Sequence, residues 1–361
     1  MISFGSKTHV INHGGNIEEA IKHYNIPKEQ WIDLSTGISP WAYPVKHLPE
    51  HVWQELPHSN HELLTVAAKY YDINAENITA TPGSQMAIRL IPQLFEPANV
   101  AIPSLGYQEH LASWQMANHQ ITIYHNTTEL LDFINNKRVD HAVVVNPNNP
   151  SGEKLSLLTV KKIASRINGV CIVDEAFIDF YQDGFSTQEI DSAIKILGDN
   201  HHDKLIILRS VGKFFGLAGI RLGFAIGSHP ILPMLNNLLE PWAISHASQH
   251  IGIQALQDSQ WQRQQKANIN QQQNAFQTVL KAFLNNNLKE YSLVKTSLFS
   301  TVFADREELA KLHHQLATQG IWTRLDSNSN ENSDGKSNEP AWLRFGLPKN
   351  LTELEKRTLH L

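Results

Sequence analysis

Cysteine is almost absent from this chain: Cys171 is the only one in 361 residues, and it lies inside an apolar stretch. A single thiol cannot form an internal disulfide, so the chain is typical of a reducing compartment and we expect a cytoplasmic protein. No apolar run approaches the roughly 20 residues needed to span a bilayer. The first residues also lack the charged start and apolar core of a signal peptide, so we expect no membrane segment.

An excess of positive charge is missing as well. Lysine and arginine number 30 against 35 aspartates and glutamates, which gives a net charge of −5. No basic surface for nucleic acid or acidic lipid is therefore expected. The fractions of hydrophobic (41%) and charged (18%) residues are ordinary for a globular protein, and the length allows one large domain with a smaller one attached.

Histidine is abundant, at 19 residues, yet it forms no recognisable pattern of metal ligands. His246 and His250 are four residues apart in a predicted helix, where they share one face. No third ligand and no intervening glutamate completes a metal motif, so we expect no metal site.

Apolar segments alternate with helical patterns over the first two thirds of the chain. Strands are predicted at 100–103, 121–124, 142–145, 170–173 and 205–208, and helices at 17–24, 60–71, 82–94 and 107–117. This alternation predicts an α/β fold with a mostly parallel sheet and helices on both faces.

The pattern becomes helical and polar beyond about residue 250. One long helix is predicted over 260–286, followed by paired strands at 322–324 and 342–346 around a polar loop at 326–339. We predict a large domain over residues 41–255, and a small α+β domain formed by residues 1–40 and 256–361.

The most informative motif surrounds Lys213. An apolar strand leads into Ser210-Val211-Gly212-Lys213, and Arg221 follows the lysine by eight residues. A lysine held at a strand end can bind an aldehyde cofactor as an imine, while the hydroxyl and the guanidinium hold an anion. Alone, the motif fits a surface lysine in a polar turn equally well.

Two upstream segments decide between these interpretations. Asn149 follows the predicted strand at 142–145, and Asp174 ends the strand at 170–173. Open α/β sheets keep their ligand sites at such strand ends. The ordered spacing of Asn149, Asp174 and Lys213 resembles the aspartate-aminotransferase superfamily, the fold-type-I enzymes that use pyridoxal 5′-phosphate.

This resemblance implies a role for each residue. Lys213 would bind the cofactor and move protons at the substrate Cα, Asp174 would pair with the pyridinium nitrogen, and Asn149 would bond the ring O3′. A phosphate cradle would comprise the following residues: Gly83, Ser84, Gln85, Ser210 and Arg221. Tyr107 and His110 are candidates for the ring that stacks on the pyridine, and we favour His110.

Two positions depart from the superfamily pattern. Phe177 stands where a tyrosine often gives a second hydrogen bond to O3′, so a weaker restraint on the phenolate is expected. Leu56-Pro57 stands where many relatives place a Tyr-Pro pair that reaches the second subunit, which leaves that contact in doubt.

The substrate side resembles the L-threonine-O-3-phosphate decarboxylases of cobalamin biosynthesis over nearly the full chain. Three features carry the resemblance: the segment His13-Gly14-Gly15-Asn16, the segment 33–40, and the pair Arg324 and Arg344. It implies that Arg344 holds the substrate carboxylate, and that Arg324, His13 and the Gly14 backbone hold its phosphate. Asn149 and Gly37 would complete the substrate site, although some decarboxylases carry Asn where Gly37 stands.

The expected reaction is therefore the decarboxylation of O-phospho-L-threonine to (R)-1-amino-2-propanol phosphate by a homodimer. Histidinol-phosphate aminotransferases share the cofactor residues and stay the alternative, although they typically carry an Asn-Glu-Asn-Pro-like segment where this chain has Gly37-Ile38-Ser39-Pro40. A non-catalytic protein that binds pyridoxal phosphate is the third hypothesis.

Overall fold

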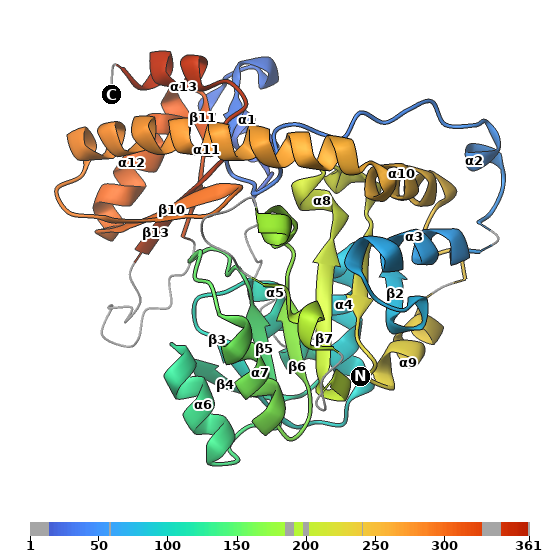
Figure 1. Cartoon of the computed structure of the whole chain (residues 1–361). Helices are drawn as coiled ribbons and strands as arrows, with labels where there is room; N and C mark the ends of the chain where they lie inside the picture. The colour runs from blue at the N-terminus through green and yellow to red at the C-terminus, as the bar shows by residue number, and fades with distance from the viewer. Residues whose placement is uncertain are drawn as a thin grey trace, which may run out of the picture.

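The computed structural model describes residues 14–57, 59–184, 191–197, 202–239, 241–326 and 341–359. These residues form a seven-stranded sheet, a four-stranded sheet and a two-stranded sheet, with helices packed around them (Figure 1). No helix among them is long and apolar enough to cross a membrane.

The seven-stranded sheet has the strand order β2-β8-β7-β6-β5-β3-β4. Its strands are β2 (Ile78–Thr81), β3 (Asn99–Pro103), β4 (Gln120–Tyr124), β5 (His141–Val145), β6 (Cys171–Asp174), β7 (Leu205–Ser210) and β8 (Gly223–Ile226). Pairing is parallel from β7 to β4, whereas β8 is antiparallel to both β7 and β2. The mostly parallel sheet is thus confirmed, and the five predicted strands form its parallel part.

Side chains alternate along each strand, so the two faces of this sheet build separate cores. Ile172, Ile206 and Leu208 belong to the core that contains residues of α4 (Ser84–Leu90), α5 (Gln108–Met116) and α9 (Ile231–Leu238). Cys171 and Val173 point to the opposite core. That core contains residues of α3 (His61–Tyr71), α6 (Thr127–Asn135), α7 (Leu157–Arg166) and α10 (His246–Gln257). Helices therefore cover both faces, as predicted.

The four-stranded sheet has the order β12-β13-β10-β9. Its strands are β9 (Ser292–Lys295), β10 (Phe299–Ala304), β12 (Arg324–Leu325) and β13 (Ala341–Gly346), and the nearby helices are α1 (Ile17–Tyr24), α12 (Arg306–Thr318) and α13 (Leu351–Thr358). Beside it, β1 (Ile32–Asp33) pairs in parallel with β11 (Ile321–Trp322). The N-terminal part of the chain is thereby joined to the C-terminal part.

The predicted long helix is confirmed as α11 (Ser259–Asn287), which runs from α10 across to the four-stranded sheet (Figure 1). Arg324 pairs with β13 as predicted, but Trp322 lies in β11 and pairs with Asp33 instead. Most of the polar loop predicted at 326–339 lies outside the described residues, and the division into two domains stays a prediction. The remaining helices, α2 (His51–Gln54) and α8 (Val211–Phe214), are short.

A cluster of buried rings stabilises the face of the sheet that carries α5. Trp114 lies 4.5 Å from His119 and 5.5 Å from His141 between ring centroids. The Nδ1 atom of His141 accepts the backbone N–H of Val170 at 3.1 Å, which requires an unprotonated Nδ1. Burial, with a smaller contribution from His119, lowers the pKa of His141 to about 4.

The low pKa of His141 predicts a loss of stability in acid. Above pH 6.5 the residue is neutral in both states. Between pH 6.5 and 4 the unfolded chain gains a proton that the folded chain does not, so the free energy of unfolding falls by about 3 kcal/mol in total. Urea unfolding across this range should show that the free energy of unfolding falls less steeply with decreasing pH in His141→Gln than in the wild type. In His47→Gln, a substitution at an exposed site, the fall should equal that of the wild type. An equal slope in wild type and His141→Gln would contradict the assignment.

Candidate active site

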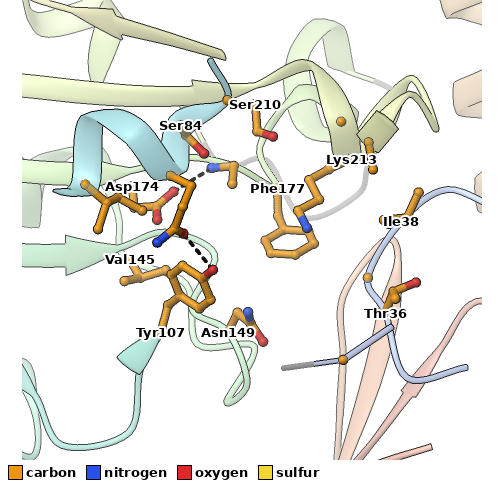
Figure 2. Close-up of a pocket in the computed structure, with 18 of the residues that line it drawn as sticks. Thr36, Ile38, Ser84, Tyr107, Val145, Asn149, Asp174, Phe177, Ser210 and Lys213 are labelled. Carbon is orange, nitrogen blue, oxygen red and sulfur yellow. Dashed lines mark hydrogen bonds between the residues drawn. The ribbon is translucent and has the colours of Figure 1, made fainter. Parts of the chain in front are cut away.

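A cavity of about 380 Å³ opens at the carboxyl ends of β5, β6 and β7, between the seven-stranded and four-stranded sheets. Its lining includes these predicted residues: Gly14, Gly37, Gly83, Ser84, Gln85, Tyr107, Asn149, Asp174, Ser210, Lys213, Arg221, Arg324 and Arg344. Figure 2 shows side chains from several separate segments converging on this space. Of the remaining predicted residues, His13 lies outside the described part of the chain and His110 does not line the cavity.

Lys213 lies on the short helix α8, which directly follows β7. Its backbone carbonyl accepts the N–H of Ser39 at 3.0 Å, so the segment that follows β1 is tied to the lysine turn. The Nζ atom lies 5.5 Å from the centre of the Phe177 ring (Figure 2). Burial, followed by the positive charge of Arg344, lowers the pKa of this amine to about 8.

Asp174 is held at the end of β6 by two donors. Its Oδ1 accepts the N–H of Ala176, and its Oδ2 accepts from His110 Nε2, both at 3.0 Å. These contacts aim a nearly buried carboxylate at the cavity and suit a partner for a protonated ring nitrogen.

The position of His110 does not meet the expectation that its ring stacks on the cofactor. His110 is in the first turn of α5, and its imidazole is 2% exposed. The ring contacts the Asp174 carboxylate and does not line the cavity. Tyr107 precedes that helix, and it is Tyr107 that lines the cavity. The Tyr107 hydroxyl donates to Gln85 Oε1 at 2.8 Å, which fixes the ring (Figure 2). Tyr107 is therefore the candidate for stacking.

One end of the cavity combines the donors of a phosphate site. Gly83 has a φ of +73°, and a Cβ there would lie 2.7 Å from Arg221 Nη2. Gly223, which the sequence analysis did not name, supports this end of the cavity without lining it: it pairs with Ser210, and a Cβ there would lie 2.3 Å from the Ser84 nitrogen. Because Gly223 has no Cβ, the start of α4 can approach the end of β7 closely. Helix amides, a hydroxyl and a guanidinium thus converge, as an anion site requires.

Arg324 and Arg344 occupy the opposite end of the cavity, directly across from each other on β12 and β13. Arg344 is 2% exposed, and its pKa is lowered well below the usual range by burial and then by Arg324. Its Nη1 donates to Asn149 Oδ1 at 2.5 Å, and its Nη2 donates to the Ser35 carbonyl. Since an arginine cannot accept, Asn149 must turn its oxygen to Arg344, which leaves its NH2 for another acceptor.

Two glycines let the chain pass close to these groups. A Cβ at Gly14 would lie 2.2 Å from the Ser35 oxygen, and a Cβ at Gly37 would lie 2.7 Å from the Phe177 ring. The sequence analysis named Ser35 only as part of the segment 33–40, because its contact with Arg344 joins residues 309 positions apart. Asp33 holds Ser35 locally: the Asp33 Oδ1 atom accepts the Ser35 N–H at 2.8 Å.

The charges that line the cavity are unequal. Four cations, Lys213, Arg221, Arg324 and Arg344, face the single carboxylate of Asp174 among the described lining residues. The Nε atom of Arg344 is moreover buried without a hydrogen-bond partner among the residues described. The cavity therefore suits anions at both ends, and its donor set fits pyridoxal 5′-phosphate with an anionic substrate.

Known proteins are similar to this chain in sequence and in fold. The sequence model of the family described as "Aminotransferase class I and II" matches residues 52–356. The threonine-phosphate decarboxylase of Pseudomonas aeruginosa is 34% identical over 342 residues, which is 94% of this chain and 93% of that protein.

Solved structures agree on the fold. The L-threonine-O-3-phosphate decarboxylase from Porphyromonas gingivalis has a TM-score of 0.66 at 18% identity, and the match covers 91% of this chain and 98% of that one. The histidinol-phosphate aminotransferase from Sinorhizobium meliloti, in complex with pyridoxal-5′-phosphate, has a TM-score of 0.77 at 15% identity, covering 99% and 97% of the two chains. The chain belongs to the aminotransferase class I and II family.

Proposed function

We propose that this protein is a pyridoxal-phosphate-dependent decarboxylase that converts O-phospho-L-threonine to CO2 and (R)-1-amino-2-propanol phosphate. The observation that carries the proposal is the pairing of Arg324 with Arg344 across β12 and β13 at the end of the cavity away from the phosphate cradle. Two guanidinium groups there suit a substrate with two anionic groups. The nearly full-length similarity to a threonine-phosphate decarboxylase supports the same activity.

Histidinol-phosphate aminotransferase is the competing candidate, because a solved structure with that name shares the fold over almost the whole chain. Its amino-alcohol substrate carries a phosphate but no carboxylate, whereas its glutamate partner carries a carboxylate next to its amine. The buried guanidinium of Arg344, oriented by Asn149, therefore suits both enzymes. The pair of Arg324 and Arg344 favours the decarboxylase, because O-phospho-L-threonine carries a carboxylate and a phosphate on one molecule. A cofactor-binding protein without activity is the weakest candidate, since Lys213, Asp174 and Arg221 all line the cavity.

The protein residues supply binding and orientation. When bound, pyridoxal phosphate supplies a ring that accepts the electron pair released as the Cα–carboxylate bond breaks. Asp174, kept in place by His110 and Ala176, would stabilise a proton on the ring nitrogen and so favour that electron flow. The Asn149 NH2 would bond the ring O3′, because Arg344 occupies the Asn149 oxygen.

Lys213 moves the proton that completes the reaction. A pKa of about 8 leaves a useful fraction of its amine neutral near pH 7.5, as a lysine that would hold the cofactor aldehyde requires. With substrate bound, Nζ would deliver a proton to the substrate Cα, so that Cα carries one hydrogen in place of the carboxylate lost as CO2. The Phe177 ring is an apolar neighbour of this amine, and it packs against the Phe299 ring with 5.2 Å between the ring centroids.

The resemblance extends the proposal to assembly and location. We propose a homodimer with both sites near the subunit boundary, in the cytoplasm. The single buried cysteine is compatible with a reducing compartment. Stacking by Tyr107, and phosphate binding by Arg324 with His13 and Gly14, are also parts of the proposal.

The activity can be tested by incubating purified protein and cofactor with O-phospho-L-threonine and no keto acid, and by measuring CO2. We expect release by the wild type and none by Lys213→Ala, with unaltered circular dichroism and loss of the lysine-dependent cofactor absorbance. Lys289→Ala, at an exposed lysine, is the matched control and should act as wild type. Absence of CO2, together with amino transfer from histidinol phosphate to 2-oxoglutarate, would establish the aminotransferase instead.

The two arginines should be separable by substrate. Loss of one charge-assisted contact costs about 2–4 kcal/mol, or roughly 30- to 1000-fold in affinity. Arg324→Ala should weaken O-phosphothreonine much more than threonine, because only the first carries a phosphate. Arg344→Ala should weaken both alike, because both carry the carboxylate. Equal penalties for the two ligands in Arg324→Ala would refute the phosphate assignment.

The pKa of Lys213 can be measured directly in the protein without cofactor. Acylation of Lys213, followed by mass spectrometry with N-acetyl-lysine as internal standard, should rise with pH around a midpoint near 8, since only the neutral amine reacts. Arg344→Met removes a neighbouring positive charge, so its midpoint should move to higher pH. A midpoint near 10.5 in the wild type would show that the amine is not perturbed.

A further inference from the structure

A buried ion cluster lies behind the cavity, and nothing in the mechanism above uses it. Arg209 on β7 is fully buried. Its Nη1 donates to Glu175 Oε2 at 2.9 Å and its Nη2 donates to Asp179 Oδ1 at 2.5 Å. The Tyr71 ring lies 4.7 Å from the guanidinium carbon. All three charged side chains are at most 1% exposed.

Each member of the central pair is the immediate neighbour of a cavity residue. Glu175 follows Asp174, and Arg209 precedes Ser210. Because successive side chains of a strand point to opposite faces, Arg209 points away from the cavity that Ser210 lines. The ion pair between Glu175 and Arg209 therefore links the backbone next to Asp174 with the backbone next to Ser210, on the face of the sheet opposite the cavity.

The cluster begins where the backbone ladder between β6 and β7 ends. Asp174 is the last residue of β6 and pairs with Leu208. The N–H of Glu175 then donates to the Leu208 carbonyl at 2.9 Å. Beyond that bond the segments separate around the cavity. The ion pair from Glu175 to Arg209 thus continues the connection at the point where backbone pairing stops.

The same cluster also fixes the segment that carries Phe177. Glu175 lies two residues before this ring and Asp179 two residues after it, and Arg209 binds both. Glu175 accepts two further bonds, from Ser192 Oγ at 2.6 Å and from the Ala193 N–H at 2.7 Å. Every partner of this carboxylate donates, so a glutamine at position 175 would turn its NH2 toward at least one of these donors.

Stability alone is a weak reason for such a cluster. Desolvation of buried charges offsets most of their attraction, and packed apolar side chains of the same volume often serve as well. What such a cluster can provide is a fixed geometry for the neighbouring cavity residues. We propose that Arg209, Glu175 and Asp179 act as a positioning unit that sets the separation of Asp174 and Ser210, and so the fit of the cofactor between its ring-nitrogen and phosphate contacts.

This inference rests on the proposed cofactor but not on the proposed substrate, so it is tested without substrate. The graded variants are Ser192→Ala, Glu175→Gln and Arg209→Met. The control is Tyr124→Phe, which deletes a buried hydrogen bond to the Val143 carbonyl on the same sheet, 2.8 Å long and outside the cavity. For each variant the pyridoxal phosphate dissociation constant and the pH titration of its absorbance are measured well below the melting temperature.

We expect Glu175→Gln and Arg209→Met to weaken cofactor binding by about 10- to 100-fold and to shift the absorbance titration, as loss of supporting contacts does at other ligand sites. Ser192→Ala should show a smaller shift in the same direction, and Tyr124→Phe should bind as wild type despite a lower melting temperature. Variants that lose thermal stability yet bind and titrate as wild type would overturn the proposal.

If Glu175→Gln and Arg209→Met do not fold, Ser192→Ala decides alone, and an unchanged dissociation constant there would equally overturn the proposal. The outcome is independent of CO2 release. A protein that fails to decarboxylate O-phosphothreonine can still show the cofactor effects, so failure of the substrate assignment and failure of the positioning unit are distinguishable.

Discussion

Parallel pairing of β5, β6 and β7 is the constraint on which the site depends. In this arrangement the carboxyl ends of the three strands meet at one edge, with Val145 beside Asp174 and Asp174 beside Leu208. Asn149, Asp174 and Lys213 follow those ends and are brought into one cavity. A one-residue slip in the β6–β7 register would move Asp174 to the opposite face of the sheet, because side chains alternate with a period of two.

The electrostatic character of the cavity follows from the charged side chains that line it. Among the described lining residues, three arginines and a lysine accompany one carboxylate. Lys213 and Arg344 have lowered pKa values because burial disfavours their charged forms. Such a site is unfavourable when it holds no anion and gains most from ligands with negative groups at both ends. Cofactor binding, substrate recognition and the reactivity of Lys213 are thus consequences of one charge distribution.

The two small sheets contribute the part of the cavity that we propose binds substrate. Pairing of β1 with β11 places the segment after Asp33 beside β13, where Ser35 accepts from Arg344 and Gly346 donates its N–H to Leu34. Close approach is possible because a Cβ at Gly346 would lie only 2.3 Å from the Thr36 carbonyl. The substrate end is therefore an assembly of two chain regions some 300 residues apart, as the Arg344 to Ser35 hydrogen bond shows.

The sequence by itself determined the α/β alternation and the long helix α11, and it named Lys213, Asp174 and Asn149 as candidate site residues, all of which line the cavity. These depend on local patterns: strand periodicity, turn residues at strand ends and the spacing between motifs.

The tertiary structure decided what local patterns leave open. Tyr107 and His110 are three residues apart, but the start of α5 between them turns one ring to the cavity and the other to Asp174. The roles of Gly223, Ser35 and the Arg209 cluster were not predicted, because each acts through contacts with residues distant in the chain. Such contacts are set by strand order and packing, which no single segment encodes.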